Sequence, residues 1–320
     1  MRPPILGLHH VTATVAEAQA DVDFASGALG LRLVKRTVNF DNHNVYHFYY
    51  GDETGRPSTL WTTFPYKGWG VPVGVHGAGQ IVATSFSVPS DALAFWEARL
   101  RDQGVVQEGA GSRFDEEILA FRDPSGLKIE LITADRDERT PWTQGGIKPD
   151  RAIRGLHSVT LLIRHPAKTV ELMTDLLGFE QVNEDAGRIR MGINGAGAGR
   201  SIDIVAAPDA PAAANGLGTV HHVALRHCRS GPAAPAARRN RSSRLAGNRG
   251  TRPVLLHIDL FPRAGRSPVR GSHSGSRLHH RRRTSPPWQE PHACRPGRNP
   301  IVLRSSHDST DYGADDLASG

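Results

Sequence analysis

The chain has 320 residues, 38% hydrophobic and 22% charged, and this length favours two domains because single cores rarely grow beyond about 250–300 residues. It contains no apolar run of the roughly 18 residues that span a membrane and no signal peptide, so we expect a cytoplasmic protein with no membrane partner. The formal charge of +7 does not indicate a basic nucleic-acid-binding body, because residues 226–320 carry +12 (18 Arg, no Lys, 6 acidic residues) and residues 1–225 carry −5.

The first 64 residues predict one βαβββ unit. Alternating apolar residues predict a strand at Leu8–Val15, followed by a helix over Ala16–Leu29 that stops at Gly30. Short β-branched and aromatic runs between turn residues predict three more strands, at Leu31–Phe40, Val45–Tyr50 and Thr59–Phe64.

The same order of elements recurs along the chain. The second unit comprises Gln80–Val88, a helix over Ser90–Leu100, and strands at Ile118–Arg122 and Leu127–Ile132. After a polar linker, the third unit comprises Gly155–Leu162, a helix over Val170–Leu177 and strands at Phe179–Asn183, Arg188–Gly192 and Ser201–Val205. A fourth unit begins at Thr219–Leu225.

From Arg226 onward the periodicity ends, and Arg, Ser, Pro, Gly and His dominate. By composition this segment is expected to be a disordered, aberrant tail over residues 226–320. Both cysteines, Cys228 and Cys294, lie in it without spacing partners, which argues against a disulfide framework and a zinc knuckle.

Four segments together, GLHHVTATV, VKRTVNFDN, VYHFYYGDETGRPSTLWTTFP and TVHHVAL, resemble the vicinal-oxygen-chelate (glyoxalase, bleomycin resistance and extradiol dioxygenase) superfamily, most of all its hydroquinone-type ring-cleaving dioxygenases. The resemblance implies an α+β fold in which paired βαβββ modules form open β-barrels. It implies a first domain at residues 5–135, a linker at 136–154, and a second domain at 155–225 whose second module is incomplete.

Such enzymes bind Fe(II), or sometimes Mn(II), through two histidines and one carboxylate, an arrangement that leaves adjacent positions open for substrate and dioxygen. Because side chains alternate along a strand, we expect only one histidine of each HH pair to face the cavity. By resemblance these metal ligands are His10 and His222. His221, His9 and Thr12 are then candidates for catalytic or hydrogen-bonding roles beside the substrate.

Other residues fit a structural interpretation better. His157 begins the corresponding strand of the third unit, but Ser158 follows it, so we interpret it as structural. His47 could face the pocket, although a surface or core position is the default expectation. Aromatic residues of the first unit are expected in the core or the pocket wall, namely Tyr46, Phe48, Trp61, Phe64 and Trp69.

The carboxylate ligand is missing from the pattern. The family places a Glu on the last strand of the fourth unit, after a Pro-Gly-Gly turn, and no such strand is predicted here. Glu130 stands at the counterpart position of the second unit and is a weaker candidate. With freely chosen synonymous codons, Arg263–Ser274 shifted by one base can read EPGGLLFEVAT, so we expect that the tail is a frameshifted reading of the gene from about Arg226.

The resemblance therefore predicts an Fe(II)-dependent ring-cleaving dioxygenase of the extradiol type. Its partners would be dioxygen and a small aromatic diol, either a hydroquinone or a catechol, and a homo-oligomer is possible. Its role would be the degradation of aromatic compounds. Loss of the carboxylate is expected to impair this chain. Two alternatives remain: a glyoxalase-type metal-dependent isomerase or lyase on the same fold, and a nonspecific nucleic-acid-binding protein that uses the basic tail.

Overall fold

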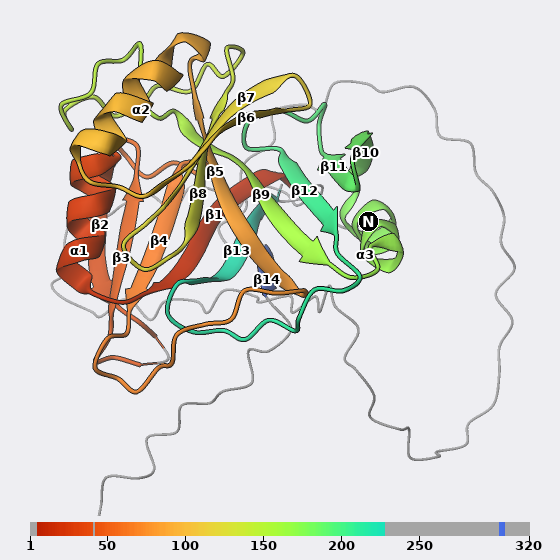
Figure 1. The fold of residues 1–320 in the computed structure, drawn as a ribbon, viewed down its shortest axis with the longest axis horizontal. Coiled ribbons are helices and arrows are strands. Elements are labelled where there is room, and N and C mark those ends of the chain that lie inside the picture. Colours follow the sequence, from red (N-terminus) through yellow and green to blue (C-terminus); the bar gives the residue numbers. More distant parts are fainter. Residues whose placement is uncertain (1–4, 41, 228–300, 305–320) are drawn as a thin grey trace, which may run out of the picture.

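Two curled, open β-sheets make up the fold in the computed structural model, which describes residues 5–40, 42–227 and 301–304 (Figure 1). The six-stranded sheet has, in spatial order, β14 (Ile301–Arg304), β13 (Thr219–His227), β1 (Ile5–Val15), β4 (Leu60–Pro65), β3 (Tyr46–Gly51) and β2 (Arg32–Val38). The eight-stranded sheet has β10 (Glu180–Asp185), β11 (Arg188–Gly192), β12 (Ser201–Ala206), β9 (Gly155–Ile163), β5 (Gln80–Val88), β8 (Lys128–Thr133), β7 (Glu116–Arg122) and β6 (Gln107–Arg113).

Three short helices lie at the edges of the sheets (Figure 1). They are α1 (Ala18–Val22), continued by a π-helix at Asp23–Ala28; α2 (Leu93–Asp102), preceded by a 3-10 turn at Ser90–Ala92; and α3 (Ala167–Leu172), continued by a π-helix at Met173–Leu177. None of the helices in the described residues is long and apolar enough to cross a membrane. The expected α+β class with open, curled sheets is confirmed.

The units that share a sheet are not neighbours in the sequence. β1 pairs antiparallel with β13, and β5 pairs antiparallel with β9, so the first unit joins the fourth and the second joins the third. The two expected domains, built from consecutive units, therefore do not coincide with the two sheets, and their bounds stay a prediction.

The chain crosses between the sheets in two segments that lie side by side. Isolated bridges join Val73 to Leu217, Val75 to Ala214 and Ala78 to Ala212. Sequence periodicity cannot reveal such a crossing, because it depends on pairing between strands far apart in the chain.

The fourth unit closes differently from the first three. In those units the first strand pairs in parallel with the last, as β1 with β4, β5 with β8 and β9 with β12. In the fourth unit the neighbour of β13 is β14, which runs antiparallel to it. This corrects the expectation of a wholly irregular tail, since Arg226 and His227 belong to β13 and residues 301–304 form β14; the rest of the tail, with Cys228 and Cys294, lies outside the described residues.

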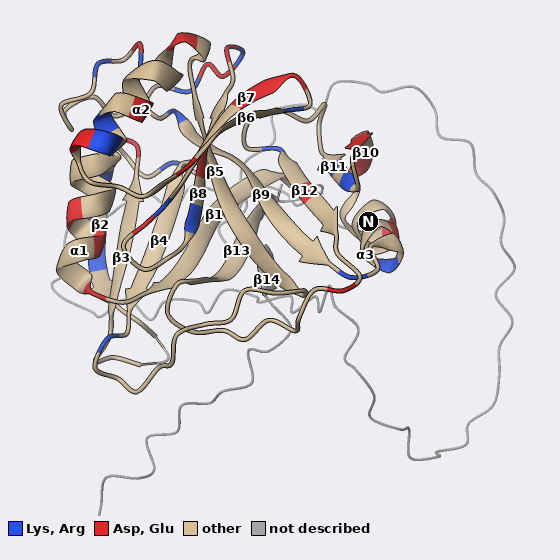
Figure 2. Ribbon diagram, viewed as in Figure 1, with Lys and Arg blue, Asp and Glu red and all other residues tan. Residues whose placement is uncertain are grey.

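Aromatic side chains join the two sheets into one core. Phe24, in the first π-helical turn, packs against Trp61 of the six-stranded sheet at 6.2 Å and against Phe121 of the eight-stranded sheet at 6.3 Å between ring centroids. All three are buried, and burial of each large apolar side chain stabilises the fold by about 1.5–3 kcal/mol. Figure 2 shows charged residues on helices, loops and outer strands, whereas β1, β4 and β9 contain none.

The segment between the expected domains is a structural clamp. Arg139 Nη1 donates to the carbonyl of Ser58, just before β4, and Arg139 Nη2 donates to the carbonyl of Leu156 in β9. Asp137, which is 3% exposed in its side chain, pairs with the same guanidinium at 2.6 Å. The clamp holds the start of the last strand of the first unit to the start of the first strand of the third unit.

Besides β14, the sequence patterns missed β6. β6 has the sequence QEGAGSR, which lacks β-branched and aromatic residues, and it is largely exposed at the edge of its sheet. It pairs with β7 through a hairpin whose turn is Phe114 and Asp115, not through the strand propensity of its own residues.

Candidate functional site

Irregular strand pairing brings both histidines of each HH pair together. The register between β1 and β13 shifts between Leu8 and His10 and again beside His222, so His9 and His221 have no paired residue in the ladder. The Nδ1 atoms of His9 and His10 lie 2.9 Å apart, and those of His221 and His222 lie 2.7 Å apart. Strict alternation was therefore the wrong expectation, because a bulge interrupts it at each pair.

The second histidines of the two pairs meet between the strands. His10 Nε2 lies 3.2 Å from His222 Nε2, with the rings edge-on at 78°. Two nitrogens bound to one ion at about 2.1 Å and separated by roughly 100° would lie about this far apart. The imidazole pair thus fits two neighbouring positions around a single metal ion.

Burial keeps His9 and His10 uncharged. It lowers the pKa of His10 to about 3, with His9 and His47 adding repulsion, and it lowers the pKa of His9 to about 4, with a smaller contribution from Arg226. Neutral imidazole is the form that binds metals, since its free ring nitrogen offers a lone pair.

Thr12 lies beside the histidine pair. Its Oγ1 is 3.0 Å from His222 Nε2 and 2.7 Å from Thr62 Oγ1, and both threonines are fully buried. The structure thus brings together all five residues proposed from the sequence: His9, His10, Thr12, His221 and His222.

Two further residues of β3 belong to the same cluster. His47 Nε2 lies 3.1 Å from Thr62 Oγ1, and His47 Nδ1 lies 3.0 Å from Tyr49 Oη. The spacing of two residues, which puts both side chains on one face of the strand, was the signal that could have identified the pair. Phe64 closes the wall of the cluster, at 4.3 Å from His47 and 5.7 Å from His221 between ring centroids.

The remaining aromatic residues divide between core and surface. Phe48 and Trp61 are buried in the core, as expected. Tyr46 and Trp69 are 49% and 46% exposed, which corrects their expected place in the core or pocket wall.

No carboxylate joins the histidines in the part of the chain that the structure describes. Within it, no group of three or more His, Cys, Asp or Glu residues could hold a metal ion. Glu130 belongs to the other sheet, where its Oε2 accepts hydrogen bonds from Ser85 and Arg113, both at 2.7 Å. The observed residues therefore supply two metal ligands and not the third.

The eight-stranded sheet carries an ion-pair network at the place that corresponds to the histidine pair. In the six-stranded sheet His10 pairs with Ala224, and in the eight-stranded sheet Ser158 pairs with Ser85 at the same place, so Ser158 is the counterpart of His10. Likewise, Thr12 pairs with His222 and Thr160 pairs with Ala83, so Ala83 is the counterpart of His222. Neither residue is a metal ligand of the histidine type.

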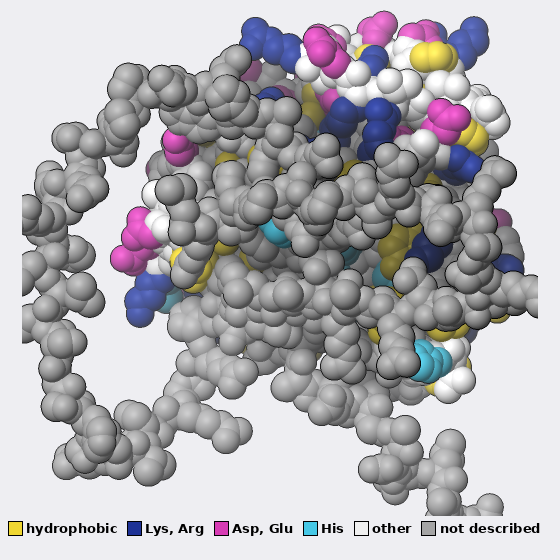
Figure 3. Space-filling view, turned by 180° about the vertical axis from the view of Figure 1, so that it is seen from behind, with side chains coloured by type: hydrophobic (Ala, Val, Ile, Leu, Met, Phe, Trp, Pro, Cys, Tyr) yellow, Lys and Arg dark blue, Asp and Glu magenta, His cyan; other side chains and the backbone are white. Residues whose placement is uncertain are grey.

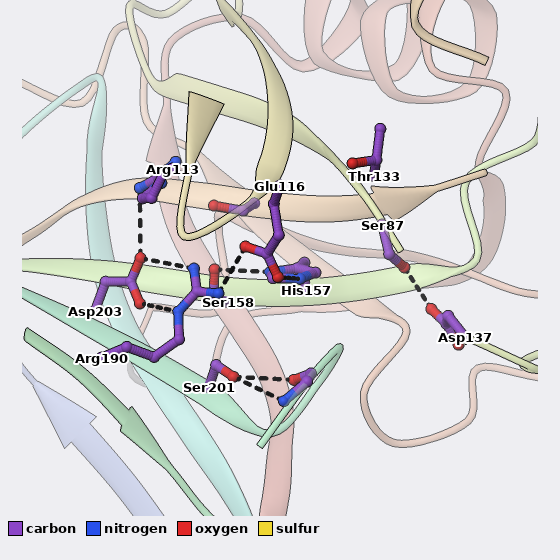
Figure 4. Close-up of polar contacts among 12 residues, drawn as sticks. Ser87, Arg113, Glu116, Thr133, Asp137, His157, Ser158, Arg190, Ser201 and Asp203 are labelled. Carbon is purple, nitrogen blue, oxygen red and sulfur yellow. Dashed lines mark hydrogen bonds and ion pairs between the residues drawn. The ribbon is translucent and has the colours of Figure 1, made fainter. Parts of the chain in front are cut away.

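Arginines neutralise the carboxylates of this second sheet (Figure 4). Asp203, fully buried, lies within 3.4 Å of Arg113, Arg188 and Arg190. Glu116 pairs with Arg190 at 2.6 Å and with His157 Nε2 at 3.1 Å, which supports the structural interpretation of His157. The network is balanced in charge, and removal of one partner would leave a buried charge uncompensated.

Charged side chains of both signs share the described surface. On the face seen from behind, Lys and Arg side chains gather next to Asp and Glu side chains in the upper part of the view (Figure 3). Lys35 and Arg36 are exposed on β2, and Lys35 Nζ lies 5.2 Å from the centroid of the Tyr49 ring.

Sequence comparisons relate the chain to known enzymes. The profile of the Glyoxalase/Bleomycin resistance protein/Dioxygenase superfamily matches residues 7–131. Over 226 residues, 71% of each protein, the chain is 42% identical to "Putative ring-cleaving dioxygenase MhqO" of Bacillus subtilis (strain 168). Over 224 residues, 68% of this chain and 70% of the relative, it is 35% identical to chlorohydroquinone/hydroquinone 1,2-dioxygenase of Sphingobium indicum.

Solved structures agree in fold. A crystal structure titled as a putative dioxygenase from Bacillus subtilis subsp. subtilis str. 168 superposes with a TM-score of 0.65 at 41% identity, covering 70% of this chain and 71% of that one. Glyoxalase I from Zea mays superposes with a TM-score of 0.53 at 13% identity, covering 68% and 73%, which shows a shared fold alone.

Proposed function

The chain belongs to the Glyoxalase/Bleomycin resistance protein/Dioxygenase superfamily, and on that premise we propose that its histidine cluster is the site of an extradiol-type ring-cleaving dioxygenase for a hydroquinone or catechol. The observation that carries the proposal is the approach of His10 Nε2 to His222 Nε2 at 3.2 Å, from β1 and β13. Two relatives with names of this activity, at 42% and 35% identity, support the same reaction class.

We assign His10 and His222 as metal ligands, with Fe(II) as the proposed metal and Mn(II) as the alternative. Such a metal supplies the redox chemistry that dioxygen requires. His9 and His221 contact the Nδ1 atoms of the two ligands and would fix their ring orientation, as outer-shell partners of metal-bound histidines do.

The substrate would lie beside Thr12, His221 and the ring of Phe64. The aromatic wall offers stacking area for a diol ring, and the hydroxyl and imidazole offer hydrogen bonds to its oxygens. These side chains would orient the diol and move its hydroxyl protons.

The chain as written would be an impaired version of this enzyme. Its described residues provide no carboxylate beside the histidines, and β14 runs opposite to the closing strands of the other units. We propose that the natural reading frame after about Arg226 encodes the missing strand with its Glu ligand, and that the cytoplasm is the site of action.

Oxygen-electrode assays test the function. The chain is loaded with Fe(II) under nitrogen and mixed with hydroquinone, chlorohydroquinone or catechol in air-saturated buffer, next to a chain with the frame restored after Leu225. We expect oxygen uptake and a ring-opened product from the restored chain and little from the chain as written. Failure of the restored chain on all three diols would contradict the ring-cleavage proposal.

The glyoxalase-type alternative predicts a different metal and no oxygen. Turnover of an α-ketoaldehyde thiol adduct with nickel or zinc, in the absence of oxygen, would favour it. The nucleic-acid alternative concerns the basic tail, which lies outside the described residues except for β14 and the end of β13.

A further inference from the structure

A row of side chains crosses five adjacent strands of the six-stranded sheet. Cross-strand pairing aligns His222 of β13 with Thr12 of β1, Thr12 with Thr62 of β4, Thr62 with Tyr49 of β3, and Tyr49 with Lys35 of β2. Directly opposite residues on one face of a sheet lie close enough for their side chains to touch. The row therefore leads from a proposed metal ligand to an exposed edge strand.

Hydrogen bonds connect Thr12, Thr62 and Tyr49 of this row through His47. The links run from Thr12 Oγ1 to Thr62 Oγ1 at 2.7 Å, from Thr62 Oγ1 to His47 Nε2 at 3.1 Å, and from His47 Nδ1 to Tyr49 Oη at 3.0 Å. Every group along this hydrogen-bonded path is a hydroxyl, an imidazole or a phenol, and each of these can accept one proton and release another. In this hydrogen-bonded path His47 provides the link from the buried threonines to Tyr49, because its two ring nitrogens contact Thr62 and Tyr49.

We propose that Thr62, His47 and Tyr49 form a proton relay that carries the hydroxyl proton of a bound aromatic diol from Thr12 to solvent. The proposal rests on the proposed function, because the diol would bind beside Thr12. His47 and Thr62 are proposed as positioning residues, since they act through Thr12 and do not touch the diol.

The proton balance of the relay is complete without a redox partner. The diol hydroxyl gives its proton to Thr12 Oγ1, Thr12 gives its own to Thr62, and Thr62 gives its own to His47 Nε2. His47 releases the proton on Nδ1 to Tyr49 Oη, and Tyr49 releases its proton to water. One O–H bond of the diol is lost, one hydronium ion is formed, and His47 changes tautomer while it stays neutral.

The surroundings of His47 favour such a neutral carrier. Burial lowers the pKa of His47 to about 3, and Lys35 from β2 and His221 from β13 act in the same direction. Tyr49 faces it from β3, and the uncharged Thr62 and Phe64 face it from β4. Burial also raises the pKa of Tyr49 to about 12, so its hydroxyl keeps its proton between transfers.

Stopped-flow measurement of proton release tests the relay. The full chain is loaded with excess Mn(II) under nitrogen and mixed with 4-nitrocatechol, whose absorbance reports binding and ionisation, in weak buffer with a pH indicator. The variants are Thr62→Val, which removes a hydroxyl at nearly constant volume, His47→Gln and Tyr49→Phe. Thr62→Ser restores the hydroxyl, and Tyr46→Phe is a matched control, because Tyr46 is exposed on the same strand.

We expect Thr62→Val and His47→Gln to slow proton release on the order of 100-fold, the scale of a lost proton-transfer group, while the equilibrium affinity for 4-nitrocatechol changes little. Thr62→Ser should recover the rate, and Tyr46→Phe should keep it. A merely structural role would lower affinity and leave the release rate of the bound fraction unchanged.

Two outcomes overturn the proposal in distinguishable ways. If 4-nitrocatechol binds and Thr62→Val releases its proton as fast as the unchanged chain, the relay is wrong and the proposed site stands. If 4-nitrocatechol binds neither this Mn(II)-loaded chain nor the chain with the frame restored after Leu225, or binds equally well after His10→Ala, the proposed site is wrong and the relay with it.

Discussion

His10 Nε2 and His222 Nε2 lie 3.2 Å apart although 212 positions separate the two residues in the sequence. The contact is made possible by antiparallel pairing of the first strand of the first unit with the first strand of the fourth. It brings two imidazole nitrogens to one point, as two ligands of one ion would lie.

Metal binding should depend on both histidines equally. We expect His10→Ala and His222→Ala each to weaken Mn(II) binding at least 100-fold, because loss of a direct ligand should exceed the roughly 10–100-fold effect of an outer-shell partner. Mn(II) binding is measured by the loss of the free-ion EPR signal during titration. His43→Ala is the control, since His43 is exposed and outside the cluster; equal binding by all three variants would place the metal elsewhere.

Sequencing of the gene around codon 226 should reveal a one-base difference from the expressed reading frame. With the frame restored, the residues after the change should read as a helix and strands, ending in a Pro-Gly-Gly turn and a strand with a Glu. We expect this chain to bind Mn(II) more tightly than the chain as written, since it would add a carboxylate to the two imidazoles. A gene without any such frame would contradict the prediction directly.

Asp21 and Asp123 should each contribute a loss of stability as the pH rises from about 4 to about 7. Burial raises the pKa of Asp21 to about 6 and that of Asp123 to about 7, whereas both groups ionise near pH 4 in the unfolded chain. At these two sites the folded chain therefore holds more protons across this window, and the stability that they contribute below pH 4 is lost as the pH passes the folded values. For Asp21 alone the loss amounts to roughly 3 kcal/mol.

The variant Asp21→Asn isolates this contribution. Asp21 Oδ2 accepts hydrogen bonds from Tyr50 Oη and Thr63 Oγ1, which an amide oxygen can still accept. We expect urea unfolding to show that stability at pH 8 relative to pH 5 is higher for the variant than for the unchanged chain, also because Asp123 loses a charged neighbour. An unchanged slope of stability with pH would show that Asp21 is ionised in the folded chain.

Removal of the Arg139 side chain should destabilise the contact between the first and third units at Ser58 and Leu156. Arg139→Ala removes the guanidinium that donates to the Ser58 and Leu156 carbonyls and pairs with the buried Asp137 carboxylate, at a cost of about 2 kcal/mol or more. Thermal or urea unfolding measures the effect. Arg136→Ala is the matched control, because Arg136 is exposed three positions away, and Arg139→Lys should fall between the two since it keeps the charge but not the planar fork.

Much of this protein follows from local sequence alone. Short runs of apolar, β-branched and aromatic residues between turn residues suffice for most strands. The GLHHVT and TVHHVA segments contain the ligand candidates, His10 and His222, before any fold is known. The sequence also showed that the carboxylate ligand is absent, because no strand with a Glu follows a Pro-Gly-Gly turn. The sequence did not predict β6, since a strand rich in Gly, Ala and Ser has no local preference for extended structure.

Only the tertiary structure decided how the units combine and what their side chains do. The pairing of the first unit with the fourth depends on contacts between distant strand edges, and no local periodicity encodes it. The bulges that turn His9 and His221 toward their neighbours depend on that pairing. The same holds for His47, whose bond to Thr62 needs β3 and β4 in register, and for Glu130, which Arg113 neutralises from another strand. The sequence determines which chemical groups are present, but contacts between strands of the two sheets determine which partner each group has and therefore what it can do.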